Sequence, residues 1–140
     1  MITLPDDVKL AINAEGEWFY PDECCGVLFG GVDREGNRTV TEILPISNAR
    51  ETEERRRRFV IEADDFMRAE SEARGKGLDV LGFYHSHPDH PAEPSAYDLE
   101  HALPFYSYAI VSVKGGTASE LTVWELEGDR SKFVPIPQAG

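Results

Sequence analysis

Short apolar runs alternate with segments of helical periodicity along this chain, and the alternation strongly restricts its fold. Runs such as residues 24–30 and 78–84 suit buried strands. None approaches the roughly 20 apolar residues that a membrane helix needs, and the first residues lack the basic-then-apolar order of a signal peptide. We therefore expect a cytoplasmic α/β protein without a membrane span, with a mixed sheet and one long helix on either face.

Proline, glycine and clusters of polar residues mark the expected ends of these elements. The predicted helices are residues 5–19, 63–76 and 95–102. The predicted strands are residues 24–30, 38–44, 59–61, 78–84, 106–113, 120–125 and 133–136. Segments 47–58 and 85–94 are rich in charge or in proline, so we expect both to be loops.

The composition is that of one folded domain rather than of a disordered tail. The chain has 140 residues, 29% charged and 10% aromatic, which indicates a single domain over residues 1–140. It carries 26 Asp and Glu against 14 Lys and Arg, a net charge of -12. Nucleic acids and anionic membranes attract basic surfaces, so this balance argues against both as partners. Cys24 and Cys25 are adjacent, which disfavours a disulfide between them, and we interpret them as reduced core residues, with a metal or redox role as the alternative.

Two histidines directly follow the apolar run 78–84. His85 and His87 are two residues apart, so on an extended strand end both side chains point the same way and can share a metal. Asp98 follows at the start of the short predicted helix. The loop between them can fold back so that the Asp98 carboxylate lies near the two histidines. Two imidazoles and one carboxylate form a catalytic zinc set that leaves the fourth position for water. The spacing therefore predicts a hydrolytic zinc site.

Amide hydrolysis at such a site also needs a base outside the metal ligands and a donor for the oxyanion. Glu23, beside the run 24–30, is the candidate base, and Ser95 is the candidate donor. Each residue has an ordinary alternative: a surface glutamate, an exposed histidine or, for Ser95 with Asp98, a helix capping box. Their joint occurrence at this spacing is what favours a metal site.

Two further histidines lie near the candidate ligands. His90 follows His87 by three residues, so it either contacts the metal or a substrate carboxylate or is an exposed loop residue. His101 lies one helical turn beyond Asp98 and is placed to orient that carboxylate.

The same residues resemble a known motif. Glu23, Cys25-Gly26-x-Leu28-x-Gly30, His85-Ser86-His87-Pro88 and Pro94-Ser95-x-x-Asp98 are similar to the JAMM motif of the JAB/MPN-plus metalloproteases, Glu followed by His-x-His-x7-Ser-x2-Asp. The similarity extends from the first helix to residues 108–113. It implies the cytidine-deaminase-like α/β fold of that family. It also implies zinc ligation by His85, His87 and Asp98, with Glu23 as general acid/base and Ser95 as oxyanion partner.

The resemblance implies a substrate class as well. Short prokaryotic members are similar to peptidases that act on ubiquitin-like sulfur-carrier proteins and release a cysteine or short tail beyond the terminal Gly-Gly. Eukaryotic members cut the isopeptide bonds of ubiquitin-like modifiers. From the chain's size we favour the sulfur-carrier peptidase, with the isopeptidase as the alternative.

The run Arg55-Arg56-Arg57-Arg58 is the basic cluster of an acidic chain. It is either a solvated loop or a site that docks an acidic carrier or the carboxylate of the released residue, for which arginine is well suited.

Other classes of protein stay open. A zinc nucleobase deaminase shares the fold, but its His-x-Glu and Pro-Cys-x-x-Cys elements are missing here. A DNA-repair-associated JAB relative has a similar His-x-His-Pro motif, although the acidic charge opposes that function. A non-catalytic interaction module is the remaining class. The oligomeric state, a homodimer included, is left undecided.

Overall fold

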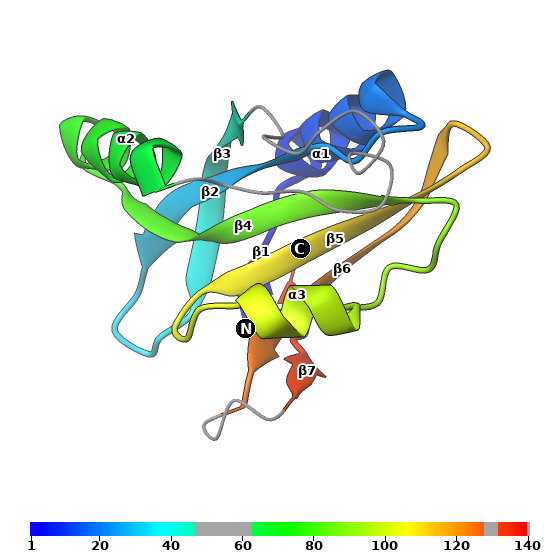
Figure 1. The fold of residues 1–140 in the computed structure, drawn as a ribbon. Helices are drawn as coiled ribbons and strands as arrows, with labels where there is room; N and C mark the ends of the chain where they lie inside the picture. Colours follow the sequence, from blue (N-terminus) through cyan, green and yellow to red (C-terminus); the bar gives the residue numbers. More distant parts are fainter. Residues whose placement is uncertain (47–62, 128–131, 140) are drawn as a thin grey trace.

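The computed structural model describes residues 1–46, 63–127 and 132–139 (Figure 1). The helices in these ranges are α1 (Asp6–Phe19), α2 (Ala63–Gly75) and α3 (Ala96–His101). The strands are β1 (Ile2–Thr3), β2 (Cys25–Val32), β3 (Arg38–Ile46), β4 (Asp79–Pro88), β5 (Ser107–Lys114), β6 (Thr117–Leu126), β7 (Phe133–Pro135) and β8 (Gln138–Ala139). Across the described part of the chain, no helix has the length and apolar character required to cross a bilayer.

One mixed sheet holds all of these strands in the order β7-β6-β5-β4-β2-β3-β1-β8. β4 lies inside it, antiparallel to β2 and parallel to β5. The C-terminal segment joins the two margins of the sheet, because β7 pairs with β6 while β8 pairs with β1. β1 and β8 have two residues each, which is too short for sequence periodicity to predict them.

Helix α1 covers one face of the sheet. Two aspartates occupy its first turn, where negative charge is favoured by the helix dipole. Its buried residues Val8, Ile12 and Gly16 recur every four positions and so form one stripe. A Cβ atom at Gly16 would lie 3.0 Å from Val113 Cγ2, so glycine allows the helix to approach β5 closely.

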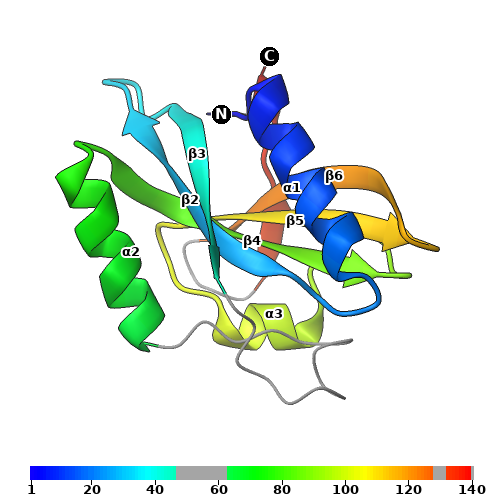
Figure 2. The same cartoon turned by 90° about the horizontal axis from the view of Figure 1, so that it is seen from above.

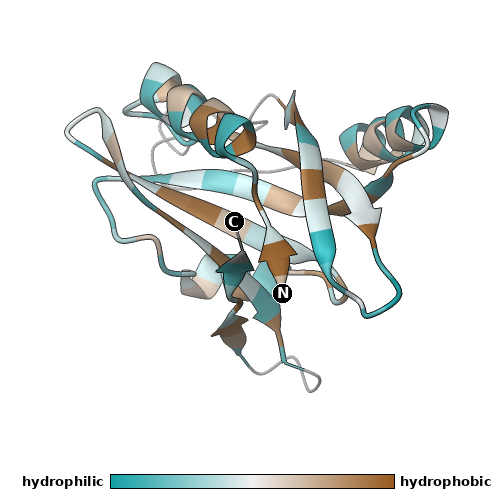
Figure 3. Cartoon of the chain, turned by 180° about the vertical axis from the view of Figure 1, so that it is seen from behind, coloured by the Kyte–Doolittle hydropathy of each residue, from teal (hydrophilic) through white to brown (hydrophobic). Residues whose placement is uncertain are grey.

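Helix α2 covers the opposite face (Figure 2). Its buried Ala69 and Ala73 belong to one hydrophobic core with Phe83, whereas Tyr84 belongs to the core under α1. Successive residues of β4 therefore serve opposite cores, as expected for a sheet covered on both faces. Figure 3 shows hydrophobic segments along the strands and a hydrophilic turn between β2 and β3.

The architecture confirms the predicted α/β fold class, with a long helix on either face of a mixed sheet. The predicted helices correspond to α1, α2 and α3, and the hairpin, the two later strands and the edge strand correspond to β2 with β3, β5 with β6, and β7. The charged segment 47–58 and the predicted strand 59–61 lie outside the described residues.

The prediction of a loop over residues 85–94 is wrong for residues 85–88, which belong to β4. His85 pairs with Cys25 of β2 and with Ile110 of β5, and His87 pairs with Ser112. Polar residues and proline usually mark a loop, but Pro88 is the last residue of the strand, where its missing N–H matters least. His85 consequently stands on a regular strand with a neighbour on either side, and His87 is paired with β5.

Candidate metal centre

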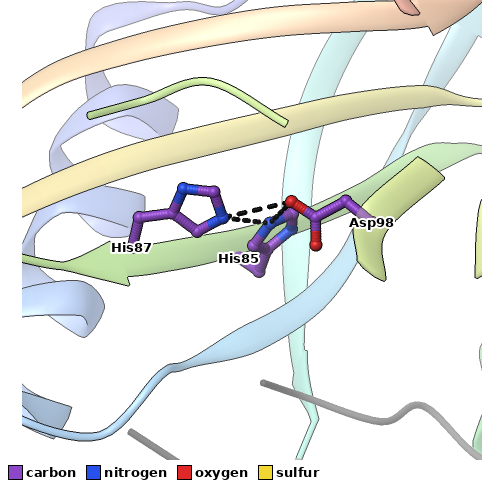
Figure 4. A group of neighbouring side chains, drawn as sticks. All are labelled: His85, His87 and Asp98. Carbon is purple, nitrogen blue, oxygen red and sulfur yellow. Dashed lines mark hydrogen bonds and ion pairs between the residues drawn. The ribbon is translucent and has the colours of Figure 1, made fainter. Parts of the chain in front are cut away.

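The end of β4 and the start of α3 direct three side chains at one another (Figure 4). His85 and His87 are separated by one residue, so both face the same side of the strand, and they are 1% and 8% exposed. Asp98 comes from the first turn of α3. The structure thus brings together the three residues predicted as metal ligands.

The three donor atoms form a compact triangle. His85 Nε2 and His87 Nε2 are 3.1 Å apart, and Asp98 Oδ2 lies 3.3 Å and 3.1 Å from them respectively. A tetrahedral ion with bonds of about 2.0 Å separates its ligand atoms by about 3.3 Å. Two imidazoles also suit a transition metal such as zinc better than Mg²⁺ or Ca²⁺, which prefer oxygen ligands. The group therefore fits a metal ion in both size and chemistry.

The protonation of the group also suits metal binding. His87 Nδ1 lies 3.0 Å from Pro91 O, and because a carbonyl only accepts, Nδ1 carries the hydrogen and Nε2 presents its lone pair to the triangle. Burial lowers the pKa of His85, which keeps that imidazole neutral near pH 7. Burial opposes ionisation of Asp98, but its contacts with His85 and His87 and the hydrogen bond from Ser95 N–H lower its pKa below the ordinary range, so the carboxylate is ionised.

Ser95 caps α3 and holds the acidic ligand in place. Its Oγ accepts a hydrogen bond from Asp98 N–H at 3.0 Å, and Asp98 Oδ2 accepts one from Ser95 N–H at 2.9 Å. This is the capping box that the sequence offers as an alternative to catalysis. The two roles are compatible, because a hydroxyl that accepts one hydrogen bond can still donate another.

Glu23 stands two residues before β2, close to the candidate metal ligands. Cys25 pairs with His85, and Ser86 N–H donates to Cys24 O at 3.1 Å, so continuing this register places Glu23 opposite His87. The side chain is 3% exposed. Glu23, His87 and Ser95 line one cleft of about 480 Å³. The predicted base and the predicted oxyanion donor therefore border the same cleft as His87, one of the candidate metal ligands.

The segments that carry Glu23 and His87 are also tied together next to the cleft. Tyr20 OH donates to Asp89 Oδ2 at 2.6 Å, and Gly115 N–H donates to Asp89 Oδ1 at 2.8 Å. Asp89 adopts a left-handed φ of 58°, a conformation that aspartate tolerates better than most residues. One carboxylate thus joins the end of α1, the end of β4 and the β5–β6 turn.

Comparison with known proteins agrees with this geometry. The family described as prokaryotic homologs of the JAB domain matches residues 5–127. The chain belongs to this JAB family. This JAB domain is also 38% identical to the desampylase of Haloferax volcanii over 117 residues, which are 83% of this chain and 78% of that protein. The resemblance stated from the sequence is therefore confirmed.

Two solved structures have the same fold as this JAB domain. The solution structure of a protein from Salinibacter ruber is 45% identical, with a TM-score of 0.77 and coverage of 99% of this chain and 90% of that one. The solution structure of a protein from Desulfitobacterium hafniense is 27% identical, with a TM-score of 0.85 and coverage of 99% and 92%.

Other residues singled out from the sequence take different places in the JAB domain. Cys24 and Cys25 are buried free thiols, as predicted, and burial raises the pKa of Cys24 to about 12. His90 lines the cleft. His101 stacks on Tyr97 and donates from Nδ1 to the carbonyl of Tyr97 at 3.0 Å, so these contacts fix it to its own helix. The run Arg55 to Arg58 lies outside the described residues.

Sequence reasoning missed two hydroxyl residues that contact the loop between His87 and Asp98. Ser112 of β5 and Thr122 of β6 donate to backbone carbonyls of that loop. No local pattern distinguishes them from other strand residues, because the contact depends on how β4, β5 and β6 align.

Proposed function

We propose that this JAB domain is a zinc-dependent hydrolase that cleaves the amide bond following the C-terminal Gly-Gly of a ubiquitin-like protein. The observation that carries the proposal is the triangle of donor atoms from His85, His87 and Asp98, bordered by a cleft that Glu23 and Ser95 also line. These three ligands would hold the zinc. When bound, zinc lowers the pKa of water to about 7 and polarises a carbonyl group.

Glu23 would act as general acid and base. Its carboxylate accepts a proton from the attacking water, and the same proton passes to the amide nitrogen as the C–N bond breaks. The hydroxyl of the water stays on the carbonyl carbon, so the products are a carboxylic acid and an amine. Burial of Glu23 limits exchange of this proton with bulk solvent.

Ser95 would stabilise the negative charge that develops on the substrate's carbonyl oxygen. Its hydroxyl lines the cleft, and the capping box fixes its backbone beside Asp98. One preorganised donor of this kind typically contributes about 10²- to 10³-fold in kcat.

The substrate class is supported by the Haloferax relative. The name desampylase denotes removal of SAMP, a ubiquitin-like protein, which supports isopeptide cleavage. The sulfur-carrier peptidase favoured from the sequence remains a prediction. Both substrates present the same Gly-Gly carbonyl, and they differ only in the amine that leaves.

A direct assay compares the two substrates. A small carrier that ends in Gly-Gly is prepared as a lysine isopeptide conjugate and, separately, with a C-terminal cysteine, and the products are identified by intact mass. We expect cleavage after Gly-Gly, loss of activity on chelation, recovery with Zn²⁺, and about one zinc per chain. His85→Ala should be inactive. Absence of bound zinc would refute the metal site, whereas bound zinc without cleavage of either substrate would indicate an interaction module.

The arginine run gives a separate test of substrate docking. If Arg55 to Arg58 bind an acidic carrier or the carboxylate of the released residue, reversing their charge should raise KM with little change in kcat. An unchanged KM would show that this run does not dock the substrate.

A further inference from the structure

The loop that joins the two halves of the metal centre is held by its backbone. It runs from Asp89 to Pro94, between His87 and the helix that carries Asp98. Three successive carbonyl groups in it accept side-chain hydrogen bonds. His90 O accepts from Ser112 Oγ at 2.6 Å, Pro91 O from His87 Nδ1 at 3.0 Å, and Ala92 O from Thr122 Oγ1 at 2.6 Å.

The two hydroxyl donors come from β5, which lies beside the histidines' strand, and from β6, which is next to β5. Ser112 pairs with His87 across β4 and β5, and Thr122 pairs with Ile110, which in turn pairs with His85. Paired residues of neighbouring strands point to the same face of a sheet, so the hydroxyls and the imidazoles share one face. The loop therefore crosses β5 and β6 on the face that carries the metal ligands.

A third side chain sets the direction of the Thr122 hydroxyl. Trp124 Nε1–H donates to Thr122 Oγ1 at 2.8 Å, so this oxygen accepts from the indole while its own hydrogen points at Ala92 O. Ala92 is fully buried, and a buried carbonyl depends on such a partner. The relay from Trp124 through Thr122 thus ends on the residue next to Pro91, whose carbonyl sets the tautomer of His87.

We infer that Thr122 is a positioning residue of the metal centre, which acts through the Ala92 carbonyl to hold the loop in its metal-binding shape. The inference rests on the metal-binding part of the proposed function. It implies that contacts from β5 and β6 help to hold the ligand triangle in shape. Loss of the hydroxyl removes the hydrogen-bond partner of Ala92 O and lets Pro91 O move away from His87 Nδ1. The affinity of the site for its metal ion then falls.

The test compares Thr122→Val with Thr122→Ser, which keeps the hydroxyl. Zn²⁺ affinity is measured by competition with a chromophoric chelator, and the visible absorption of the Co²⁺-loaded protein reports ligand geometry. Thr122→Val should weaken Zn²⁺ binding about 10- to 100-fold and alter the Co²⁺ spectrum. Thr122→Ser should restore both. Thr41→Val is the matched control, because its hydroxyl contacts Phe29 O in the β2–β3 pair.

The possible failures are distinguishable. If the wild type binds no Zn²⁺, the proposed function fails and this inference with it. If the wild type binds Zn²⁺ and Thr122→Val matches it in affinity and spectrum, only the positioning role is refuted. Should Thr122→Val not fold, Trp124→Phe removes the indole donor instead, and an affinity equal to that of the wild type refutes the relay.

Discussion

Replacing Ser95 separates its role as a helix cap from its proposed role in catalysis. In Ser95→Ala the Asp98 N–H loses its 3.0 Å partner, which should lower the free energy of unfolding by about 1 kcal/mol, or about 4 °C in Tm. The 2.9 Å bond from the Ser95 backbone N–H to Asp98 Oδ2 does not depend on the side chain, so zinc should be retained. Loss of the hydroxyl should lower kcat about 10²- to 10³-fold.

Ser95→Asn provides the decisive comparison. Asparagine caps a helix about as well as serine, so this variant should recover the stability lost in Ser95→Ala. Its amide does not reproduce the position of the hydroxyl, so kcat should stay low. The measurements are urea unfolding, zinc stoichiometry and kcat on the isopeptide conjugate. Recovery of kcat in Ser95→Asn would show that capping alone matters, and loss of zinc in Ser95→Ala would show that the backbone bond does not hold Asp98.

Three further predictions concern the proposed base, the packing of β4 and a partly buried acid. Glu23→Gln should lower kcat about 10²- to 10⁴-fold at unchanged zinc content. A variant with full activity would show that Glu23 is not the general base. Gly82→Ala should destabilise the fold by about 3 kcal/mol in urea unfolding, since its Cβ would lie 1.8 Å from a carbonyl oxygen of β5, whereas Gly31→Ala meets nothing within 4 Å and should be neutral. Burial raises the pKa of Glu15 above its ordinary value of 4.5. The stability that its protonated form contributes to the fold is therefore fully present below pH 4.5 and is lost as the pH rises through the raised pKa of the folded protein. Glu15→Gln should therefore gain stability relative to the wild type as pH increases from 4.5, and parallel pH profiles would contradict this.

The elements that the sequence predicts well are those governed by local rules. Helix α1 shows Val8 and Ile12 four positions apart on its buried face, a spacing that needs no knowledge of the sheet. The capping box is likewise local, because a serine followed three residues later by an acid can close it within one turn. The sequence does not predict residues 85–88 as a strand, because their polar residues and proline are typical of a loop. Pairing with β2 and β5, whose residues are distant in the chain, outweighs this local preference.

The candidate metal ligands can be predicted from the sequence for the same physical reason. A strand repeats its side-chain direction every two residues, so the spacing of His85 and His87 already places both imidazoles on one face, and a helix start positions Asp98 relative to Ser95. The relations between distant segments are different. The alignment of Glu23 with His87, the pairing of β1 with β8, and the contact of Thr122 with Ala92 all depend on strand register. Register is set by how side chains on both faces of the sheet pack and by turn geometry, which involve residues far apart in the sequence, so no local segment predicts it and only the folded chain shows it.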